Sequence, residues 1–411
     1  MTWADDFDME VSFAFGDDPF DISPTYVEVT SQVVSVTINR GRTDYLSPFP
    51  TGTCTVVLKD ETRDFDPLNT GSPYWVSGAT QIVPRVQMRV QVDDSGGGPK
   101  TLFEGHVRPR DGWQYSYSAA PAFTTVTVHC EDLLGLLATA WLDEIASNHG
   151  GNTASARVGL VCDEAGIPGG WRSWENGTIT LAPTTWGENA LEHVQKVVEA
   201  EGGVLYATRT GEIRMDGRYA VQEVTRQSTV QDTFDDTASY ADYLHGQIEI
   251  DYRTDVVNKV SAFNGAGEGG TATDATSIAA YGEARLERTG LLVSDGNQAE
   301  ALAEWLVAGL KDPEVSIKRI SFAAWANDAL RDAAATSELH DRILVRFTPP
   351  NDGDTGLISQ EVLVESIVHQ MTLTDWTVTW GFNPAALWDP ADGLSLMKWD
   401  VSTWDNAVWA W

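Results

Sequence analysis

Strict alternation of apolar and polar residues is the feature that most constrains the fold of this chain. In RVQMRVQV, residues 85–92, every second residue is apolar, and residues 34–39, 54–58 and 126–130 follow the same period. A period of two puts the apolar side chains on one face of a β-strand and leaves the other face to water. Such strands are typical of antiparallel sandwiches and barrels. The acidic, glycine-rich segment at 93–98 then predicts a hairpin loop.

Helical spacing replaces this alternation between residues 132 and 218. Leucines at 133–137 predict a short apolar helix. A second helix is expected after a capping box in which Thr185 is the N-cap and Glu188 lies three residues later. Gly202 and the glycine after it would end that helix. The next segment, VLYATRTGEIRM, predicts a hairpin, so this part of the chain is expected to be a small α+β unit.

Strand patterns return in the second half of the chain. They cover Ile248–Tyr252 and Val256–Phe263, and the polar stretch GAGEGGTATDAT then interrupts them. A helix is expected from about Ser294 to Lys311 because apolar residues recur there at helical spacing. The remaining predicted strands lie at 315–322, 343–347, 361–369 and 376–380.

The two halves of the chain repeat one order of elements. The first half has a strand at 85–92, an acidic glycine loop, the strand LFEGHV at 102–107, a turn and a strand at 124–130. The second half runs in the same order from DRILVRF at 341–347 through NDGDTG to EVLVESIVH and DWTVTWGF. A simple meander would produce part of this similarity, so a duplication is the sharper of two interpretations. A duplicated chain would contain two similar β-barrels, and three copies would present six similar units.

An excess of acidic residues excludes several classes of partner. The chain carries 60 Asp and Glu against 27 Lys and Arg, a net charge of −33. A grip on nucleic acid or anionic lipid needs basic side chains that replace counterions. Solubility of an abundant protein and a surface that repels DNA, such as the lining of a conduit, both account for the charge. The sequence has no apolar run of eighteen residues and no signal-peptide pattern, so we expect no membrane anchor and folding in a cytosol.

The sequence predicts no catalytic, metal or cofactor site. The histidines form no HExxH motif, and His369 lies in a strand pattern where a structural role is expected. Nucleophile-elbow, Walker A and dinucleotide-binding glycine motifs are lacking. Cys54, Cys130 and Cys162 are odd in number and outside any CxxC, so buried thiols are expected. The loop at 351–356 has oxygen ligands of a calcium loop but lacks the later glutamate, which favours a hairpin loop.

The end of the chain is unusually rich in tryptophan. The last 24 residues contain Trp388, Trp399, Trp404, Trp409 and Trp411. A tail that folds back onto its own domain is one interpretation. The other is a partner-binding extension, because tryptophan buries a large area and is enriched at interface hot spots. Exposed tryptophans would favour aggregation, so we predict that these five residues contact a neighbouring subunit or the next protein of an assembly.

A set of short motifs resembles the minor tail proteins of siphophages. These motifs are Arg40-Gly41-Arg42 in a turn, a strand of Gly-x-Cys-x-Val-x-Leu type, Phe65-Asp66-Pro67, Ser72-Pro73-Tyr74, LFEGHV, VVNKV at 256–260, SIAAYG at 277–282 and the strand that begins at Trp376. Together they span residues 22–388. Their order and spacing are more specific than any one motif.

This resemblance implies a tail hub, similar to the central hub of contractile-phage baseplates and to the N-terminal part of tail-associated lysins. The implied fold is mainly β with α+β insertions, and it combines two tube-like antiparallel β-barrel domains with smaller α/β domains. The expected division is a first barrel domain at 1–131, a small α+β domain at 132–218, a second barrel domain at 219–272 and 313–384, an inserted helical segment at 273–312 and a Trp-rich extension at 385–411.

The function implied by the resemblance is that of a non-enzymatic structural subunit of the virion's tail tip, made in the host bacterial cytoplasm. A homotrimer would close the distal tail tube and connect the hexameric ring of the distal tail protein to trimeric fibre or spike proteins. The end of the tape measure protein would lie in its lumen, and DNA would pass without specific binding. Tail-associated lysins continue into a hydrolase or spike, whereas this sequence stops at Trp411, which implies that a lysin activity is missing or lies on another chain.

Two other functions stay open at this point. One is a receptor- or carbohydrate-binding β-protein of the tail tip, in which tryptophans would stack on sugars. The other is an enzyme that degrades peptidoglycan or polysaccharide.

Overall fold

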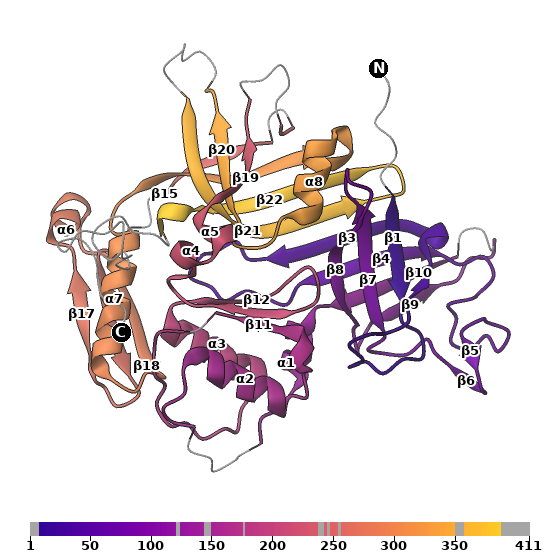
Figure 1. Ribbon diagram of the computed structural model, residues 1–411, viewed down its shortest axis with the longest axis horizontal. Helices are drawn as coiled ribbons and strands as arrows, with labels where there is room; N and C mark the ends of the chain where they lie inside the picture. The colour runs from indigo at the N-terminus through magenta and orange to yellow at the C-terminus, as the bar shows by residue number, and fades with distance from the viewer. Residues whose placement is uncertain are drawn as a thin grey trace.

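One large β-sheet runs through both halves of the molecule. The computed structural model describes residues 8–120, 124–143, 149–175, 177–236, 242–244, 247–253, 256–349 and 357–387. The sheet has 14 strands. In chain order they are β1 (Met9–Phe13), β2 (Val27–Glu28), β3 (Val33–Gly41), β4 (Thr53–Lys59), β7 (Gln87–Asp93), β8 (Pro99–Val107), β9 (Trp113–Ser116), β10 (Thr125–Glu131), β14 (Val230–Phe234), β15 (Glu249–Arg253), β19 (Glu314–Ala323), β20 (Arg342–Phe347), β21 (Ile358–Met371) and β22 (Trp376–Pro384). The long strands β3, β21 and β22 cross the middle of the molecule in Figure 1.

The remaining elements are short or lie in smaller units. The helices are α1 (Leu133–Thr139), α2 (Ala154–Glu164), α3 (Ala190–Glu201), α4 (Ala220–Glu223), α5 (Thr225–Ser228), α6 (Ala275–Tyr281), α7 (Gly296–Leu310) and α8 (Asp328–Thr336). The other strands are β5 (Trp75–Val76), β6 (Ala79–Thr80), β11 (Arg172–Trp174), β12 (Val204–Ala207), β13 (Ile213–Asp216), β16 (Lys259–Asn264), β17 (Gly269–Thr273) and β18 (Arg285–Leu291). Single 3₁₀ turns are η1 (Thr30–Gln32), η3 (Gly169–Trp171), η4 (Ala324–Ala326) and η6 (Ala385–Leu387).

The alternating segments form strands of the large sheet, as predicted. On β4 the side chains of Cys54, Val56 and Leu58 are fully buried, and the residues between them are partly exposed. One detail of the prediction is wrong. Val34 is 47% exposed, because the register of β3 against β4 shifts between Val33 and Ser35 and turns Val33 into the core instead.

Both halves of the sheet have the same strand order. Neighbouring strands of the first half follow β3-β4-β10-β8-β7-β1, and those of the second follow β15-β19-β22-β21-β20-β14. Numbered along the chain within each half, with the short strands β2 and β9 left out, both orders are 2-3-6-5-4-1. The halves differ in the last pair, since β1 and β7 are antiparallel whereas β14 and β20 are parallel. This shared order of six strands supports the internal duplication that the sequence suggested.

The halves join edge to edge. Strand β21 pairs antiparallel with β3, from Ser366 opposite Gly41 to Met371 opposite Val36. The described strands therefore form one open path rather than two closed barrels. The predicted mainly β fold with a large antiparallel sheet is confirmed, and the prediction of two closed barrels is not.

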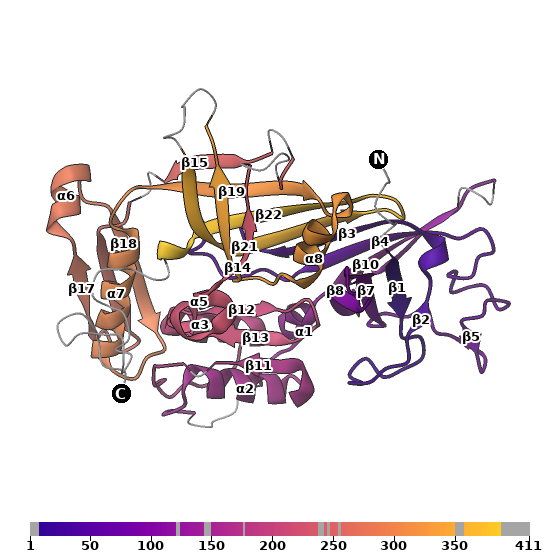
Figure 2. The same ribbon diagram turned by 45° about the horizontal axis from the view of Figure 1, so that its top comes forward.

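A small α+β unit lies beneath the long strands in Figures 1 and 2. Its sheet has the order β11-β13-β12, and α1, α2 and α3 belong to the same stretch of chain. The predicted hairpin is present between β12 and β13, with Gly211 at φ +75°. Helix α3 starts later than predicted, because its N-cap is Asn189 and not Thr185. Gly202 ends the helix at φ +71°, as predicted.

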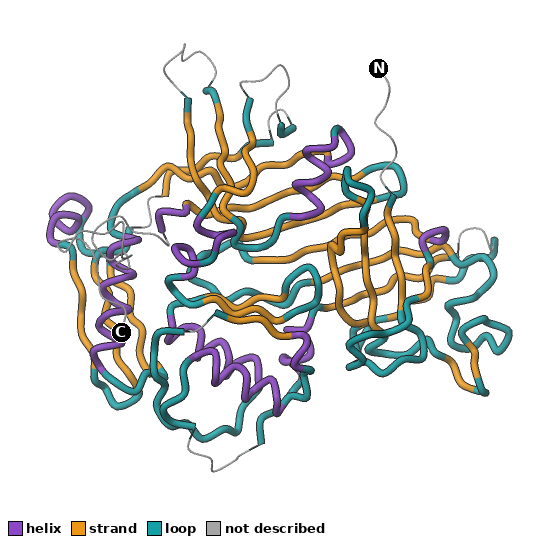
Figure 3. The backbone as a smooth tube through the Cα atoms, in the orientation of Figure 1, coloured by secondary structure: helices purple, strands orange, loops and turns teal. Residues whose placement is uncertain are grey.

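A second small unit is inserted into the second half of the large sheet. It contains a sheet with the order β17-β16-β18, together with α6 and α7. Figure 3 shows its helices and strands side by side at the left edge of the molecule. The polar stretch after β16 was expected to interrupt the strands, but it forms a hairpin that continues into β17. Sheet and helix thus occur together from residue 259 to 310, and the predicted domain boundaries stay a prediction.

Candidate functional site: the joint between the two halves

A buried ion pair accompanies the pairing of β3 with β21. Arg42 follows directly after β3, and its backbone N–H donates to the Glu365 carbonyl at 2.8 Å. Its Nε donates to Glu365 Oε2 at 2.7 Å, and both side chains are almost fully buried. Glu365 is available for this contact because it lies where the register of β21 against β22 shifts, between Val364 and Ser366. A bulge therefore turns a carboxylate toward the end of the neighbouring strand.

Gly41 permits the close approach of the two strands. Its φ is +100°, and a Cβ built on it would lie 2.1 Å from the Glu365 carbonyl oxygen. A side chain at this position would collide with the backbone of β21, and glycine alone adopts this conformation without strain. The Arg-Gly-Arg motif, expected in a turn, is instead the end of a strand and forms the joint.

Arg40 connects the joint to the small α+β unit. Its Nη2 donates to the carbonyl of Ala207 at 2.8 Å and forms an ion pair with Glu338. Glu338 Oε2 in turn accepts from the backbone N–H of Arg209 at 2.8 Å, and Arg209 Nη1 donates to the Thr101 carbonyl at 2.8 Å. One network therefore holds both halves of the sheet and the hairpin of the small unit.

The electrostatics of the joint favour an ionised Glu365. Burial by itself would raise the pKa of this carboxyl, but the charge of Arg42 and the nearby His340 outweigh burial and lower the pKa to about 2. His340 Nε2 lies 3.5 Å from Glu365 Oε1. On the same strand, burial lowers the pKa of His369 to about 3. The neutral ring accepts a hydrogen bond from Trp376 Nε1 at 3.1 Å, so His369 has the structural role predicted for it.

A third perturbed group near the joint also has a structural explanation. Burial raises the pKa of Asp132 to about 7. Its carboxylate caps α1 by accepting from the Leu134 N–H at 2.9 Å, and it accepts from the Gly52 N–H at 2.6 Å. Perturbed carboxyl groups are common at catalytic sites. Here the Asp132 carboxylate accepts hydrogen bonds from backbone N–H groups, and the Glu365 carboxylate forms an ion pair with Arg42.

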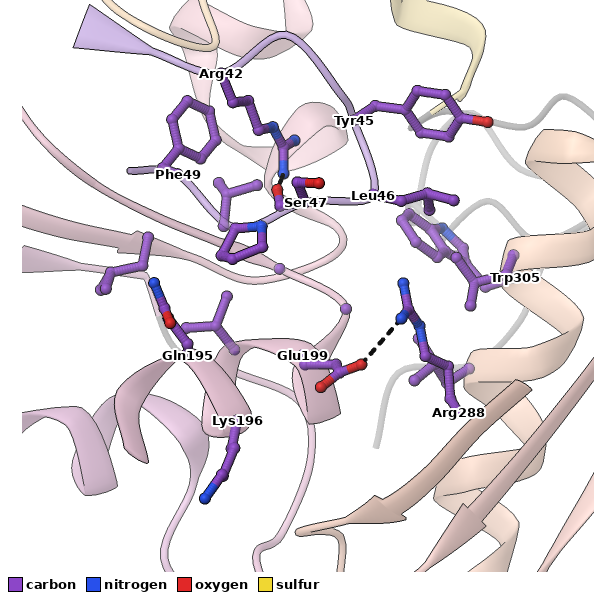
Figure 4. Close-up of a pocket in the computed structure, with 18 of the residues that line it drawn as sticks. Arg42, Tyr45, Leu46, Ser47, Phe49, Gln195, Lys196, Glu199, Arg288 and Trp305 are labelled. Carbon is purple, nitrogen blue, oxygen red and sulfur yellow. Dashed lines mark hydrogen bonds and ion pairs between the residues drawn. The ribbon is translucent and has the colours of Figure 1, made fainter. Parts of the chain in front are cut away.

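A cavity of about 360 Å³ lies beside the joint, where three parts of the molecule meet. Figure 4 shows the loop with Tyr45, Leu46 and Phe49 at the top, helix α3 below it and Trp305 of α7 at the right, next to Leu46. Arg288 of β18 forms an ion pair with Glu199 of α3 at 3.2 Å across the lower rim. The cavity is therefore a seam between the first half of the sheet, the small α+β unit and the inserted unit.

The aromatic side chains that line this cavity are buried against the protein. Trp305 is only 5% exposed, so its ring offers no open face for stacking on a sugar. Arg42 lies over the ring of Phe49, with its guanidinium carbon 4.3 Å from the ring centroid, and Nη1 donates to the Ser47 carbonyl at 2.7 Å. These contacts hold the loop after β3 in place.

The outer face of the central strands is uncharged over most of its width. Strands β3, β4, β10 and β22 each carry partly exposed threonines on this face. They are Thr37, Thr53, Thr55, Thr125, Thr127, Thr377 and Thr379. Hydroxyl groups and backbone therefore dominate this face, although the chain as a whole is strongly acidic.

The sequence-predicted interface residues lie outside the described part of the chain. These are Trp388, Trp399, Trp404, Trp409 and Trp411, and the loop at 351–356 also lies outside it. The three cysteines are buried free thiols, as predicted. Within the described ranges no group of three His, Cys, Asp or Glu side chains could hold a metal ion, and no helix is long and apolar enough to span a bilayer.

Sequence reasoning missed the partners that make the joint. The Arg-Gly-Arg motif is visible in the sequence, but Arg42 and Glu365 are 323 positions apart. Glu338 and His340 carried no signal at all. A glutamate in the middle of the apolar run EVLVESIVH was the available clue, because a charged residue at a buried strand position needs an opposite charge.

Known proteins resemble this chain in structure and not in sequence. No family model matches the sequence, and no curated protein matches it significantly. The tail protein from Neisseria meningitidis MC58 matches with a TM-score of 0.59 over 94% of this chain and 99% of its own, at 12% identity. The 43 kDa tail protein of prophage MuSo2 from Shewanella oneidensis matches with a TM-score of 0.54 over 92% and 100%, at 14% identity. This chain therefore has the fold of these two tail proteins.

Proposed function

We propose that this protein is a structural hub subunit at the tip of a phage tail and that it acts through its interfaces and not as an enzyme. The observation that carries the proposal is the repeated order of six strands, with the two halves joined edge to edge in one chain. The two structural neighbours, both tail proteins, support the same assignment.

The repeat suggests how a trimer would meet a sixfold tube. Three copies of a chain with two similar halves place six similar units around one axis, and cyclic assemblies of this kind are common. Such a homotrimer would stack on the hexameric ring of the distal tail protein and close the end of the tube. Its other side would carry trimeric fibre or spike proteins, and the tape measure protein would end in its lumen. The virion tail tip is thus the proposed location, after synthesis in the host cytoplasm.

The two halves would complete their tube walls on assembly. Among the described residues, each half has a strand edge without a neighbour, and a ring would supply that neighbour. On this view residues 1–131 and the interrupted region 219–384 are the two tube domains, and the inserted unit at 259–310 stands outside the wall.

The passage of DNA through the lumen needs a wall that does not bind it. An acidic lining was the expectation from the net charge, because like charge removes the gain from counterion release. The threonine-rich face of the central strands does not supply that lining. If this face lines the channel, DNA would slide along neutral hydroxyl groups and the acidic side chains would lie elsewhere.

Imaging of the purified protein tests the proposal. We expect native mass spectrometry to show a trimer and negative-stain microscopy to show a ring with a central hole. A monomer at every concentration, also in the presence of the neighbouring ring protein, would count against a hub. Glycan-array binding by such a monomer would favour the receptor-binding alternative, and clearing of host cell walls in a zymogram would favour an enzyme.

A further inference from the structure

The joint between the halves pairs strands that have defined positions in the shared strand order. Within one chain, β21 is the fifth strand of its half and pairs with β3, the second strand of the other half. The two halves share their strand order. The same type of edge is therefore available on the fifth strand of the first half and on the second strand of the second half.

Strands β8 and β9 together correspond to β21. Strand β10 pairs with Val107 of β8 and then with β9 from Trp113 onward, with the turn at 108–112 between them. Strand β22 likewise pairs with β21 on both sides of the bulge at Glu365. The part of β21 that pairs with β3 lies beyond this bulge. Its counterpart in the first half is β9.

The pairing registers allow individual positions to be matched. TVT at 125–127 of β10 corresponds to TVT at 377–379 of β22. Thr125 is opposite Ser116, and Thr377 is opposite Gln370. Ser116 is therefore the counterpart of Gln370.

The other side of the joint is matched in the same way. Thr37 is opposite Thr55, which is opposite His129 of β10. Glu249 is opposite Arg319, which is opposite Gly381, the counterpart of His129 on β22. Glu249 is therefore the counterpart of Thr37. Since Gln370 is paired with Thr37 in the joint, the matching contact would place Ser116 opposite Glu249.

Both strands have an open edge in the part of the chain that the structure describes. Strand β9 pairs there with β10, and β15 pairs there with β19, with no second neighbour for either. Ser116 and Glu249 have exposed side chains. Figure 1 shows β9 and β15 on opposite sides of the molecule, so one chain cannot pair its own two edges. Open strand edges invite pairing with another chain unless they are covered.

We propose that β9 of one copy pairs antiparallel with β15 of a second copy and repeats the β21–β3 joint between molecules. The contact is head to tail, so it closes a ring when the rotation between halves is about one sixth of a turn, and three copies then form six halves. This inference rests on the proposed homotrimer and names the two edges that form it.

A disulfide between the two edges tests this register. In the variant Ser116→Cys/Glu249→Cys, directly opposed residues come within the range of about 4.4–6.8 Å between Cα atoms that a disulfide needs. The three native thiols are buried and will not interfere under mild oxidation. We expect covalent trimer, with dimer as an intermediate, on a non-reducing gel, and its loss on reduction. Each single variant should give no trimer.

Two matched variants control for geometry. Thr37→Cys/Gln370→Cys places the same pair in the joint within one chain, and it should form an internal disulfide at monomer mobility. Ser116→Cys/Asp251→Cys moves one cysteine by two residues on β15, to an exposed position, and should cross-link at least fivefold less.

The outcomes separate this inference from the proposed function. If native mass spectrometry shows a trimer and the internal control closes, but the Ser116/Glu249 pair gives no cross-linked trimer, the proposed edge pairing is wrong and the hub stands. If the protein is monomeric with and without the ring protein, both fail. Equal cross-linking by the displaced pair would also overturn the proposed register.

Discussion

Arg42 and Glu365 are far apart in the sequence and form an almost fully buried ion pair at the joint. The balance of energies at such a pair depends on which change is made. Removal of one partner leaves a buried charge without compensation and costs roughly 3–5 kcal/mol, whereas replacement of both by apolar groups is often close to neutral. We therefore expect the pair to contribute to the specificity of the strand register more than to net stability.

A double-mutant cycle checks this view of the ion pair. We expect Arg42→Met to lower the free energy of unfolding by about 3 kcal/mol, because Glu365 is left buried and unpaired. Arg42→Met/Glu365→Leu should recover at least half of that loss. Urea unfolding followed by tryptophan fluorescence provides the measurement, since Trp376 and Trp380 are fully buried close to the joint. If the double variant lost as much free energy of unfolding as the two single variants together, this view of the ion pair would be wrong.

The pH dependence of stability follows from His369. Its pKa is about 3 in the folded protein against an ordinary value of 6.5, so the unfolded chain takes up the proton first. Its contribution is therefore complete above pH 6.5 and is lost as the pH falls toward 3. The pKa of Glu365 is lowered from 4.5 to about 2. Its contribution to the free energy of unfolding is therefore complete above pH 4.5 and is lost as the pH falls toward 2.

We therefore expect the wild-type protein to lose stability between pH 7 and pH 5, by about 2 kcal/mol for each such buried histidine. The variant His369→Gln keeps a hydrogen-bond acceptor for Trp376 and should reduce this pH dependence. We expect the variant protein to be less stable than the wild type at pH 7. Urea unfolding at both pH values measures the difference. An unchanged slope in the variant would show that His369 does not carry it.

At the scale of elements, helix α3 shows how tertiary contacts select a helix start. The capping-box pattern predicts an N-cap at Thr185, whereas the observed N-cap is Asn189. Asn189 Oδ1 accepts from the Leu191 and Glu192 N–H groups, and its Nδ2 donates to the carbonyls of Ala138 and Ala140 at the C-terminal end of α1. This one side chain caps α3 and also satisfies carbonyl groups at the end of α1. A capping box at Thr185 offers no such second contact.

Paired alanine substitutions compare the two signals. We expect Asn189→Ala to lower the free energy of unfolding by about 1–2 kcal/mol, the usual loss for an N-cap. Thr185 is exposed and lies outside the helix, so Thr185→Ala should change stability by less than about 0.5 kcal/mol. Thermal unfolding by circular dichroism distinguishes the two variants, and equal losses would mean that the helix starts earlier.

At the scale of the whole molecule, the repeated halves and the tryptophan-rich end have different roles in the proposed assembly. The strand edges would form the ring. Trp388, Trp399, Trp404, Trp409 and Trp411 are proposed to contact a neighbouring subunit or the next protein of the tail tip. A residue of this size loses little side-chain entropy for the area that it buries.

Deletion of residues 395–411 tests the second role. We expect the truncated protein to keep the circular dichroism spectrum and melting temperature of the full chain within about 2 °C, and to be depleted at least tenfold from purified tails. Immunoblots of tails assembled with each form give the comparison. A variant with Asp400→Asn and Asp405→Asn in the same segment should assemble normally. Incorporation of the truncated protein into tails at the level of the full chain would contradict the proposed role of the tryptophan-rich end.

The sequence by itself determined the local structure of most strands, helix α7 and the hairpins β7–β8 and β12–β13. Their periods of two and 3.6 residues depend only on which side chains avoid water. The order of motifs was also enough to expect a repeated, mainly β chain with the fold of a tail protein.

Tertiary structure alone decided how the two halves meet. The closure of β3 onto β21 depends on Gly41, on a bulge that turns Glu365 toward Arg42 and on a charge network that reaches Arg209. These contacts join residues hundreds of positions apart, and no local period encodes which strand edge finds which partner. The choice between closed barrels and one continuous sheet depended on that pairing, because strand edges are chemically alike until a specific side chain distinguishes them.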